Sequence, residues 1–191
     1  MANKPRQLSI GMNILGLGGH GAAWRTDESS HGSLTNIEYF QNIARISERG
    51  TLDAIFLADG PALGESVARQ PAGRLEPTIL LTAVALATTH IGVIATASTT
   101  YNEPFNLARR IASMDFASGG RAAWNAVTNA GDAAAQNFGL TGAPLHVDRY
   151  ERAMEFLDVV VKLWDSWEDD AIIGDWKNGR FADPNKVHAI D

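Results

Sequence analysis

The stretch that decides the fold reads DAIFLA (53–58), PTILLTAVALATT (77–89) and IGVIATA (91–97), with a loop over residues 60–75. The first and third segments are short apolar runs, typical of strands buried on both faces. Pro77 stands where a first helical position is expected, and residues 78–89 are apolar on nearly every side, so we predict a deeply packed helix. A strand, a helix and a strand in this order predict parallel strands joined by a helical crossover.

Strands and helices are predicted to alternate along the rest of the chain as well. Residues 8–15 and 121–127 are predicted strands, and residues 35–49, 105–117 and 148–167 are predicted helices. The 191 residues suffice for one α/β domain. Its parallel sheet can be either an open doubly wound sheet or a (β/α) barrel.

Local signals refine some of these segments. Thr35 and Glu38 form a capping-box pattern at the start of helix 35–49, and Gly50 is expected to end this helix. Residues 186–190 (KVHAI) look like the beginning of a further strand. The helix 148–167 has an apolar stripe with steps of three or four residues, formed by Tyr150, Met154, Leu157, Val161 and Trp164.

The composition excludes several classes of function. A formal net charge of −6 without a basic run gives no reason to expect binding of nucleic acid or of an anionic membrane. The absence of cysteine excludes disulfides and thiolate catalysis, and the scattered histidines predict no metal site. Neither a nucleophile elbow nor a P-loop motif occurs. No apolar run is long enough to span a bilayer, and residues 1–9 lack the apolar core of a signal peptide, so a cytoplasmic protein is expected.

A glycine-rich motif follows the first predicted strand. Gly16, Gly18 and Gly21 spell G-x-G-x-x-G, which in a dinucleotide-binding fold opens a helix whose N-terminus meets a pyrophosphate. Residues 22–32 have no sustained apolar period, so the helix that this fold requires is missing. We therefore predict an irregular active-site loop, in which His20 could face a site.

Small polar residues stand at the ends of the predicted strands. Since ligands of parallel α/β proteins bind at the carboxyl ends of the strands, these residues predict a polar, weakly acidic rim for a ligand bound through hydrogen bonds. The rim residues are Asn13, Asp59, Thr96, Ser98, Thr99, Thr100, Asn125, Thr128 and Asn129.

Several separate segments resemble one family in sequence order. They are GHGAAWR (19–25), ERGTLDAIFLADG (48–60), LEP (75–77), SGGRAAWNAVT (118–128), NFG (137–139), RYERAMEF (149–156), LWDSW (163–167) and FADPNKVH (181–188). Together they resemble the nitrilotriacetate monooxygenase component A and dibenzothiophene-sulfone monooxygenase group of the bacterial luciferase-like, FMN-dependent monooxygenases. The resemblance covers residues 8–191.

This resemblance implies a TIM-type (β/α) barrel that takes reduced FMN from a separate flavin reductase and uses O2 to oxygenate a small organic substrate. The flavin contacts of the family fall on Asp59, Thr96, His146 and Tyr150. Asn125 and Thr128 are expected close by, and His20 is the candidate for steering the oxygen chemistry. From the residues alone, the structural interpretation is favoured for all four: Asp59 as a turn residue, Thr96 as a strand residue, His146 as a helix cap and Tyr150 as a core residue.

Family chains are considerably longer, and a further flavin contact, a serine, falls beyond Asp191. The resemblance thus implies that residues 1–191 are the N-terminal portion of one barrel domain, with the first four or five of its βα units. We expect such a chain to bind FMN weakly or not at all and to self-associate. The alternatives are a non-catalytic, truncated remnant and a flavin- or deazaflavin-dependent enzyme of the same superfamily that transfers hydride.

Overall fold

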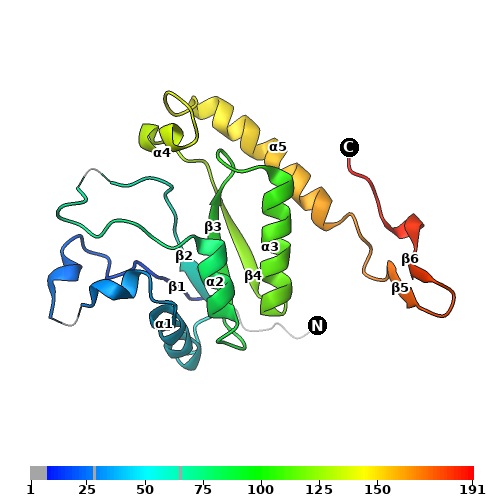
Figure 1. Cartoon of the computed structure of the whole chain (residues 1–191), viewed down its shortest axis with the longest axis horizontal. Coiled ribbons are helices and arrows are strands. Elements are labelled where there is room, and N and C mark those ends of the chain that lie inside the picture. The colour runs from blue at the N-terminus through cyan, green and yellow to red at the C-terminus, as the bar shows by residue number, and fades with distance from the viewer. Residues whose placement is uncertain (1–7, 28, 65) are drawn as a thin grey trace.

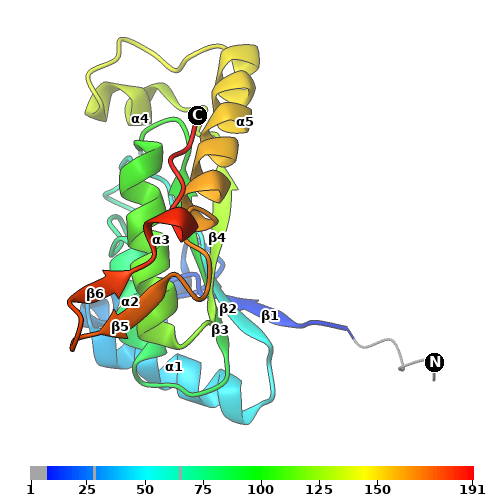
Figure 2. The same cartoon turned by 90° about the vertical axis from the view of Figure 1, so that its right-hand side faces the viewer.

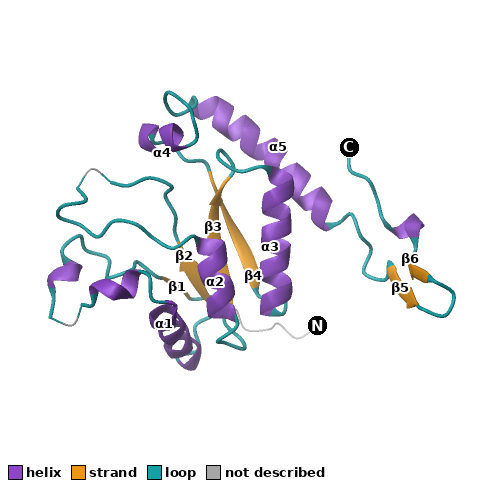
Figure 3. Ribbon diagram, in the orientation of Figure 1, coloured by secondary structure: helices purple, strands orange, loops and turns teal. Residues whose placement is uncertain are grey.

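The computed structural model of the chain describes residues 8–27, 29–64 and 66–191 (Figure 1). The elements of the main body are, in chain order, β1 (Gly11–Asn13), η1 (Ala23–Arg25), η2 (His31–Leu34), α1 (Ile37–Arg49), β2 (Ala54–Leu57), α2 (Pro77–Ala85), β3 (Gly92–Ser98), α3 (Pro104–Ser118), β4 (Ala122–Val127), α4 (Asp132–Asn137) and α5 (His146–Trp164). A C-terminal unit follows, with β5 (Ile172–Asp175), β6 (Arg180–Ala182) and η3 (Pro184–Lys186) (Figure 3). Within the described ranges, no helix is long and apolar enough to cross a membrane.

The strands β1 to β4 form one parallel sheet in the order β1-β2-β3-β4. Helices α1, α2 and α3 each connect one strand to the next, as the sequence predicts. In a doubly wound sheet the order would reverse around the first strand. The sequential order is that of a (β/α) barrel, and it rules out the open-sheet alternative.

The core lies between one face of this sheet and helices α1 to α3, which Figure 2 shows on the same side of the strands. Ile55, Val93 and Ala95 point into this core and are fully buried. Because successive strand residues point to opposite faces, Phe56 and Ile94 lie on the other face, where they are only half-buried. In a closed barrel this other face is the interior.

The helix ends follow local signals, with one correction. Asn36 is the N-cap of α1, and its side chain accepts a hydrogen bond of 2.9 Å from the backbone N–H of Glu38. The capping box predicted with Thr35 is wrong, because the backbone of Thr35 instead closes the short helix η2. Gly50 ends α1 and Pro77 begins α2, as predicted.

Helix α5 packs against α3 with a different side from its predicted stripe. Its buried residues are Arg149, Ala153, Phe156 and Val160, and the rings of Phe156 and Trp124 lie 5.8 Å apart. In contrast, four of the five residues of the predicted stripe are exposed, with values from 40% at Trp164 to 72% at Met154, and Leu157 is half-buried. The helix has two apolar stripes, and only its neighbours decide which of them is buried.

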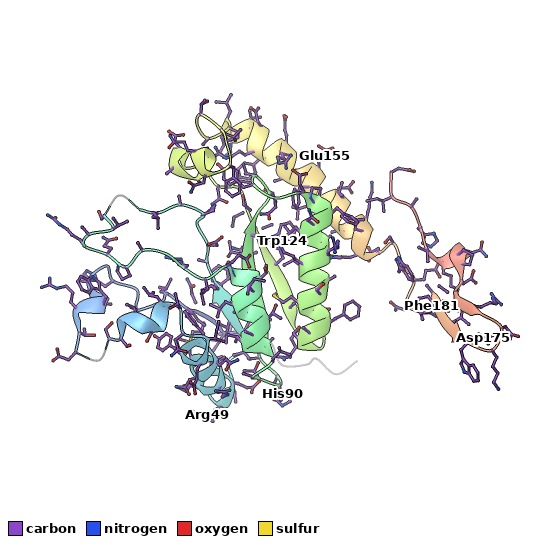
Figure 4. All side chains as sticks on the ribbon, in the orientation of Figure 1. Arg49, His90, Trp124, Glu155, Asp175 and Phe181 are labelled. Carbon is purple, nitrogen blue, oxygen red and sulfur yellow. The ribbon has the colours of Figure 1, made fainter. Side chains whose placement is uncertain are left out.

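The C-terminal residues form a hairpin instead of the predicted strand over 186–190. The strands β5 and β6 pair antiparallel, and Val187 forms only an isolated bridge with Trp167. Gly174 and Gly179 have positive φ angles of 64° and 69°, which glycine adopts at low cost and which permit the sharp turn. In Figure 4 the labelled residues Asp175 and Phe181 lie on this hairpin, away from Trp124 on the sheet.

Two charged side chains stabilise the turn between α2 and β3, at the amino end of the sheet. One carboxylate oxygen of Glu48 accepts hydrogen bonds of 2.6–3.0 Å from the backbone N–H groups of residues 89–91. These bonds lower the pKa of Glu48 from 4.5 to about 2. The guanidinium of Arg121 donates to backbone carbonyls of the same turn, those of Ala85, Thr88 and Ile91.

Candidate functional site

The candidate site lies at the carboxyl edge of the sheet, where parallel strands all end. Asp59 follows β2 by two residues, and Thr96 and Asn125 lie near the ends of β3 and β4. Helix α4 and the first turn of α5 lie beyond the same edge (Figure 1). The topology therefore brings the residues predicted for cofactor binding to one side of the molecule.

Thr96 and Asn125 form a hydrogen-bonded pair on neighbouring strands. They are register partners, and the amide nitrogen of Asn125 donates to the hydroxyl oxygen of Thr96 at 3.0 Å. Their strand neighbours Ala95 and Ala97 point into the helix-side cores, so this pair faces the interior side of the sheet. The Thr96 hydroxyl proton and the Asn125 carbonyl oxygen thus provide one donor and one acceptor for a ligand.

His146 and Tyr150 lie one turn apart at the start of α5. Their rings stack with centroids 4.5 Å apart and an interplanar angle of 27°. Tyr150 is 52% exposed, and it lines a groove of about 390 Å³ between α5 and the edge of β4. Thr128 lines the same groove, whose other walls are largely apolar.

Asp59 is half-buried. Burial raises the pKa of its carboxyl above the usual value, and repulsion by Glu76 adds to this, while the N–H of Gly60 and the charge of Arg74 oppose it. The residue lines a second groove of about 720 Å³ together with Arg74 and Asn137.

The glycine motif is irregular backbone, as predicted. Gly16 and Gly18 have positive φ angles of 64° and 131°, and a Cβ at Gly18 would lie 2.6 Å from that of Ala23. Only a single 3-10 turn, η1, follows the motif before η2 and α1, so the dinucleotide-binding helix is absent from the described residues.

His20 is exposed in this loop and is set apart from the His146–Tyr150 stack. Its Nδ1 accepts a hydrogen bond of 3.1 Å from the backbone N–H of Ala22. It lines a third pocket of about 230 Å³, which adjoins the groove of Asp59 because Arg74 and Gln70 line both. The structure therefore groups His20 with the Asp59 side of the site.

The sequence did not single out Arg149, a functional candidate of the same edge. Its side chain is buried, and its Nε has no hydrogen-bond partner. Side-chain oxygens of Thr100, Tyr101 and Asn129 are also buried without partners, in the loops after β3 and β4. One signal was available: Arg149 precedes Ala153, Phe156 and Val160 at helical spacing, which placed a charged residue on a buried face.

No cluster of three or more histidine, aspartate or glutamate side chains that could hold a metal ion occurs among the residues that the structure describes. The candidate site consists of the hydrogen-bonded pair Thr96 and Asn125, the carboxyl of Asp59, the stacked rings of His146 and Tyr150, and the buried guanidinium of Arg149.

Comparison with known proteins identifies the family. The model of the luciferase-like monooxygenase family matches residues 17–189. Among curated proteins, N-acetyl-S-(2-succino)cysteine monooxygenase of Bacillus subtilis (strain 168) is 42% identical over 191 residues, which are 100% of this chain and 43% of the relative. Nitrilotriacetate monooxygenase component A of Aminobacter aminovorans is 44% identical over 202 residues, covering 100% of this chain and 44% of the relative.

A solved structure shows the same fold. Riboflavin lyase, crystallised with modified FMN and its substrate riboflavin, superposes with a TM-score of 0.86 at 37% identity, over 97% of this chain and 44% of that chain. The chain thus spans less than half the length of the proteins it matches. The family match, the sequence identities and the sequential parallel sheet agree, and the chain belongs to the luciferase-like monooxygenase family.

Proposed function

We propose that residues 1–191 form the N-terminal portion of a single luciferase-like barrel domain and carry part of its flavin site. In this proposal the enzyme is an FMN-dependent monooxygenase that receives reduced FMN from a separate flavin reductase and oxygenates a small organic substrate with O2. The observation that carries the proposal is the set of hydrogen-bonding side chains at the carboxyl edge, several with buried atoms that lack partners. Family membership supplies the reaction class.

The residues at this edge fit FMN chemically. A ribityl phosphate requires many hydrogen bonds, and the unpartnered atoms of Thr100, Tyr101, Asn129 and Arg149 are buried polar groups that need partners. A flavin ring requires flat and apolar surfaces, which the stacked rings at the start of α5 and the walls of the β4 groove provide. Bound reduced FMN would supply the electrons that activate O2.

The side chains of this chain then have binding and orienting roles. Thr96 and Asn125, held in register by their mutual hydrogen bond, present a fixed donor and acceptor to the cofactor. Asp59 accepts from the cofactor at the opposite flank, and Tyr150 with Thr128 borders the groove beside β4. We assign to His20, which lines the pocket that adjoins Asp59, the role of steering the oxygen chemistry.

Flavin titration tests this proposal. Wild type, Asn125→Ala and the control Asn106→Ala, an exposed asparagine on α3, are titrated with FMN by fluorescence quenching. Because the chain carries only part of the flavin site, we expect weak but saturable binding by wild type and the control. In Asn125→Ala we expect binding weakened about tenfold further, since one lost hydrogen bond contributes about 1 kcal/mol or more. Absence of saturable binding by wild type would support the non-catalytic alternative.

The type of chemistry is tested by oxygen consumption. Wild type is mixed anaerobically with photoreduced FMN or reduced deazaflavin and then exposed to O2 in a stopped-flow spectrometer. The monooxygenase proposal predicts that the protein changes the rate of FMN reoxidation and leaves the deazaflavin unaffected. Binding of the reduced FMN or deazaflavin without any change in the rate of reoxidation by O2 would support the hydride-transfer alternative.

Partners and location complete the proposal. The name of the Aminobacter relative, component A, supports a two-component system with a reductase. The exposed apolar residues farther along α5, Val161 at 49% and Trp164 at 40%, support a homo-oligomer, because apolar surface of this kind favours association. Sedimentation velocity of wild type and Val161→Glu tests this, with a shift toward monomer expected in the variant. We place the protein in the cytoplasm.

A further inference from the structure

The loops after β1 and β2 enclose the pocket of about 230 Å³ that His20 lines. Both loops lie on the same side of the molecule in Figure 1, and the indole Nε1 of Trp24 in the first loop donates to the backbone carbonyl of Arg69 in the second at 3.0 Å. This bond holds the two walls of the pocket together. The volume lies below the range of pockets for drug-sized ligands, so the pocket suits a smaller organic molecule.

The deep walls of this pocket are apolar. Phe40, Leu57 and Leu80 line it and are buried in the core, and Leu17 and Trp24 line it and are half-buried. Apolar walls favour the hydrocarbon part of a ligand, because its transfer from water is favourable.

Hydrogen-bond donors border the same pocket. A Cβ at Gly21, the last glycine of the motif, would lie 3.0 Å from the amide nitrogen of Gln70, so the absence of a side chain there lets Gln70 lie against the first loop. The Nδ1 of His20 accepts the hydrogen bond from the N–H of Ala22, so the neutral ring carries its proton on Nε2 and offers a donor. Both side chains line the pocket.

Arg74 adds a cation to these donors. It is exposed, and it lines the pocket, whereas no carboxylate of the described residues does. Its Nη1 donates to the backbone carbonyl of Ala58 at 3.3 Å, which is long for such a bond, and it forms no ion pair with a carboxylate that the structure describes. Most of its donors are therefore left for a ligand.

Arg152, on α5, shows what an arginine with a structural role looks like. Its guanidinium donates to the backbone carbonyls of Thr99 and Asn102, both at 3.0 Å, and lies 3.8 Å from the carboxylate of Glu103. These three partners fasten α5 to the loop after β3. Arg74 has one long bond in place of these three partners, so a purely structural role leaves its position at the pocket unexplained.

We propose that this pocket binds the organic substrate by a carboxylate, which Arg74 binds at the exposed side while the apolar walls take the hydrocarbon part. A planar guanidinium matches the two oxygens of a carboxylate, and a neutral molecule of the same shape cannot form this charged pair. The inference rests on the proposed function, because it names the substrate class of the same enzyme. It makes Arg74 a specificity-determining residue.

The test uses two probes of matched size, hexanoate and hexanamide, which differ in charge. The proteins are wild type, Arg74→Met, Arg74→Lys and Arg69→Met, the last an exposed arginine of the same loop that lies outside the pocket lining and controls for net charge. Binding is followed by the NMR signal of the Trp24 indole N–H, which is identified by its loss in Trp24→Phe. FMN is titrated separately by fluorescence quenching, and circular dichroism checks that each variant is folded.

We expect wild type and Arg69→Met to bind hexanoate about 5- to 20-fold more tightly than hexanamide, the range for one charge-assisted pair that water partly screens. In Arg74→Met this preference should fall to within about twofold, while the affinities for hexanamide and for FMN stay unchanged. Arg74→Lys should lie between, because an ammonium keeps the charge but lacks the planar pair of donors.

Three results overturn the inference and leave the proposed function intact, provided that FMN still binds: no binding of either probe by wild type, equal binding of both probes, or an unchanged preference in Arg74→Met. A loss of FMN affinity in Arg74→Met equal to the loss of hexanoate affinity assigns the guanidinium to the cofactor and also overturns it. If wild type binds hexanoate through Arg74 but shows no saturable FMN binding, the carboxylate pocket stands and the proposed function fails.

Discussion

The hydrogen bonds of Glu48 predict a specific dependence of stability on pH. One oxygen of this carboxylate accepts from three successive backbone N–H groups at the start of β3, and the side chain is half-buried at the surface. The substitution Glu48→Gln keeps an acceptor oxygen and removes the charge. Glu48→Ala removes both, and leaves the three N–H groups to water.

The expected magnitude follows from this geometry. A hydrogen bond to a charged group contributes about 1.5–3 kcal/mol, but three bonds that share one partly hydrated oxygen are not additive. We therefore expect Glu48→Ala to lower the free energy of unfolding by about 2–3 kcal/mol at pH 7. For Glu48→Gln we expect about half of this loss, since bonds to a neutral acceptor are roughly half as strong.

The sign of the pH effect follows from the pKa. The folded-state pKa of Glu48 is about 2, below its ordinary value of 4.5. Its contribution is thus complete above about pH 4.5 and is lost as the pH falls toward 2. The free-energy difference between wild type and Glu48→Gln should be constant from pH 8 to pH 5 and then shrink.

Urea unfolding followed by circular dichroism measures this difference at intervals between pH 8 and pH 3. Glu155→Gln is the matched control, because Glu155 is exposed on α5, and Figure 4 shows it at the far end of the molecule from His90. The control should differ from wild type by at most about 0.5 kcal/mol at every pH. A loss in Glu48→Gln that does not change between pH 7 and pH 3 would refute the role of the charge.

Other substitutions have equally definite outcomes. Arg121→Met removes the donors to three carbonyls of the α2–β3 turn, so chemical unfolding should show a loss of about 2–4 kcal/mol in the free energy of unfolding. The exposed control Arg109→Met should lose at most about 0.5 kcal/mol, and a similar loss in both variants would contradict the role of Arg121. Burial raises the pKa of Asp59, so its ionised form destabilises the folded protein above this pKa, and Asp59→Asn should raise the melting temperature at pH 7. This gain should shrink as the pH falls through the raised pKa and be absent below the ordinary value of 3.8, and a lower melting temperature at pH 7 would count against the reasoning. Gly119 caps α3 at a φ of 69°, and no atom lies within 4 Å of the position that a Cβ would take there. In thermal unfolding, Gly119→Ala should therefore lower the stability by about 1 kcal/mol from backbone strain alone. The control Gly131→Ala, at a φ of −93°, should lower it clearly less.

The local sequence contains enough information for the order and type of the main elements. The apolar runs around Ile55 and Val93 predict strands of a parallel sheet with both faces covered, and they are strands, although the face of Phe56 and Ile94 is only half-buried. Pro77 begins a helix because its fixed φ suits a first turn. The irregular glycine loop was also predictable, because residues 22–32 lack the apolar period that a packed helix requires. The short helix α4 was missed, since its six residues carry no distinct pattern.

The site residues required a different kind of information. Chain order alone placed Thr96 and Asn125 on successive strands, but their 3.0 Å hydrogen bond depends on the register of β3 and β4. The isolation of Arg149 could not be read from the sequence, because it depends on which carboxylates fail to reach it in space. The binding roles of Asp59, His146 and Tyr150 stay predictions, which the flavin titrations test.

By itself, then, the sequence determined the alternation of strands and helices, the polar ends of the strands and the family. These depend on short-range periodicity and local caps, which act over a few residues. Tertiary structure alone decided which stripe of α5 is buried, which of two adjacent residues caps α1, and which arginine has its partners. The physical reason is that burial and pairing are properties of neighbours in space: Met154 and Phe156 are both apolar and lie two residues apart, yet only Phe156 meets α3.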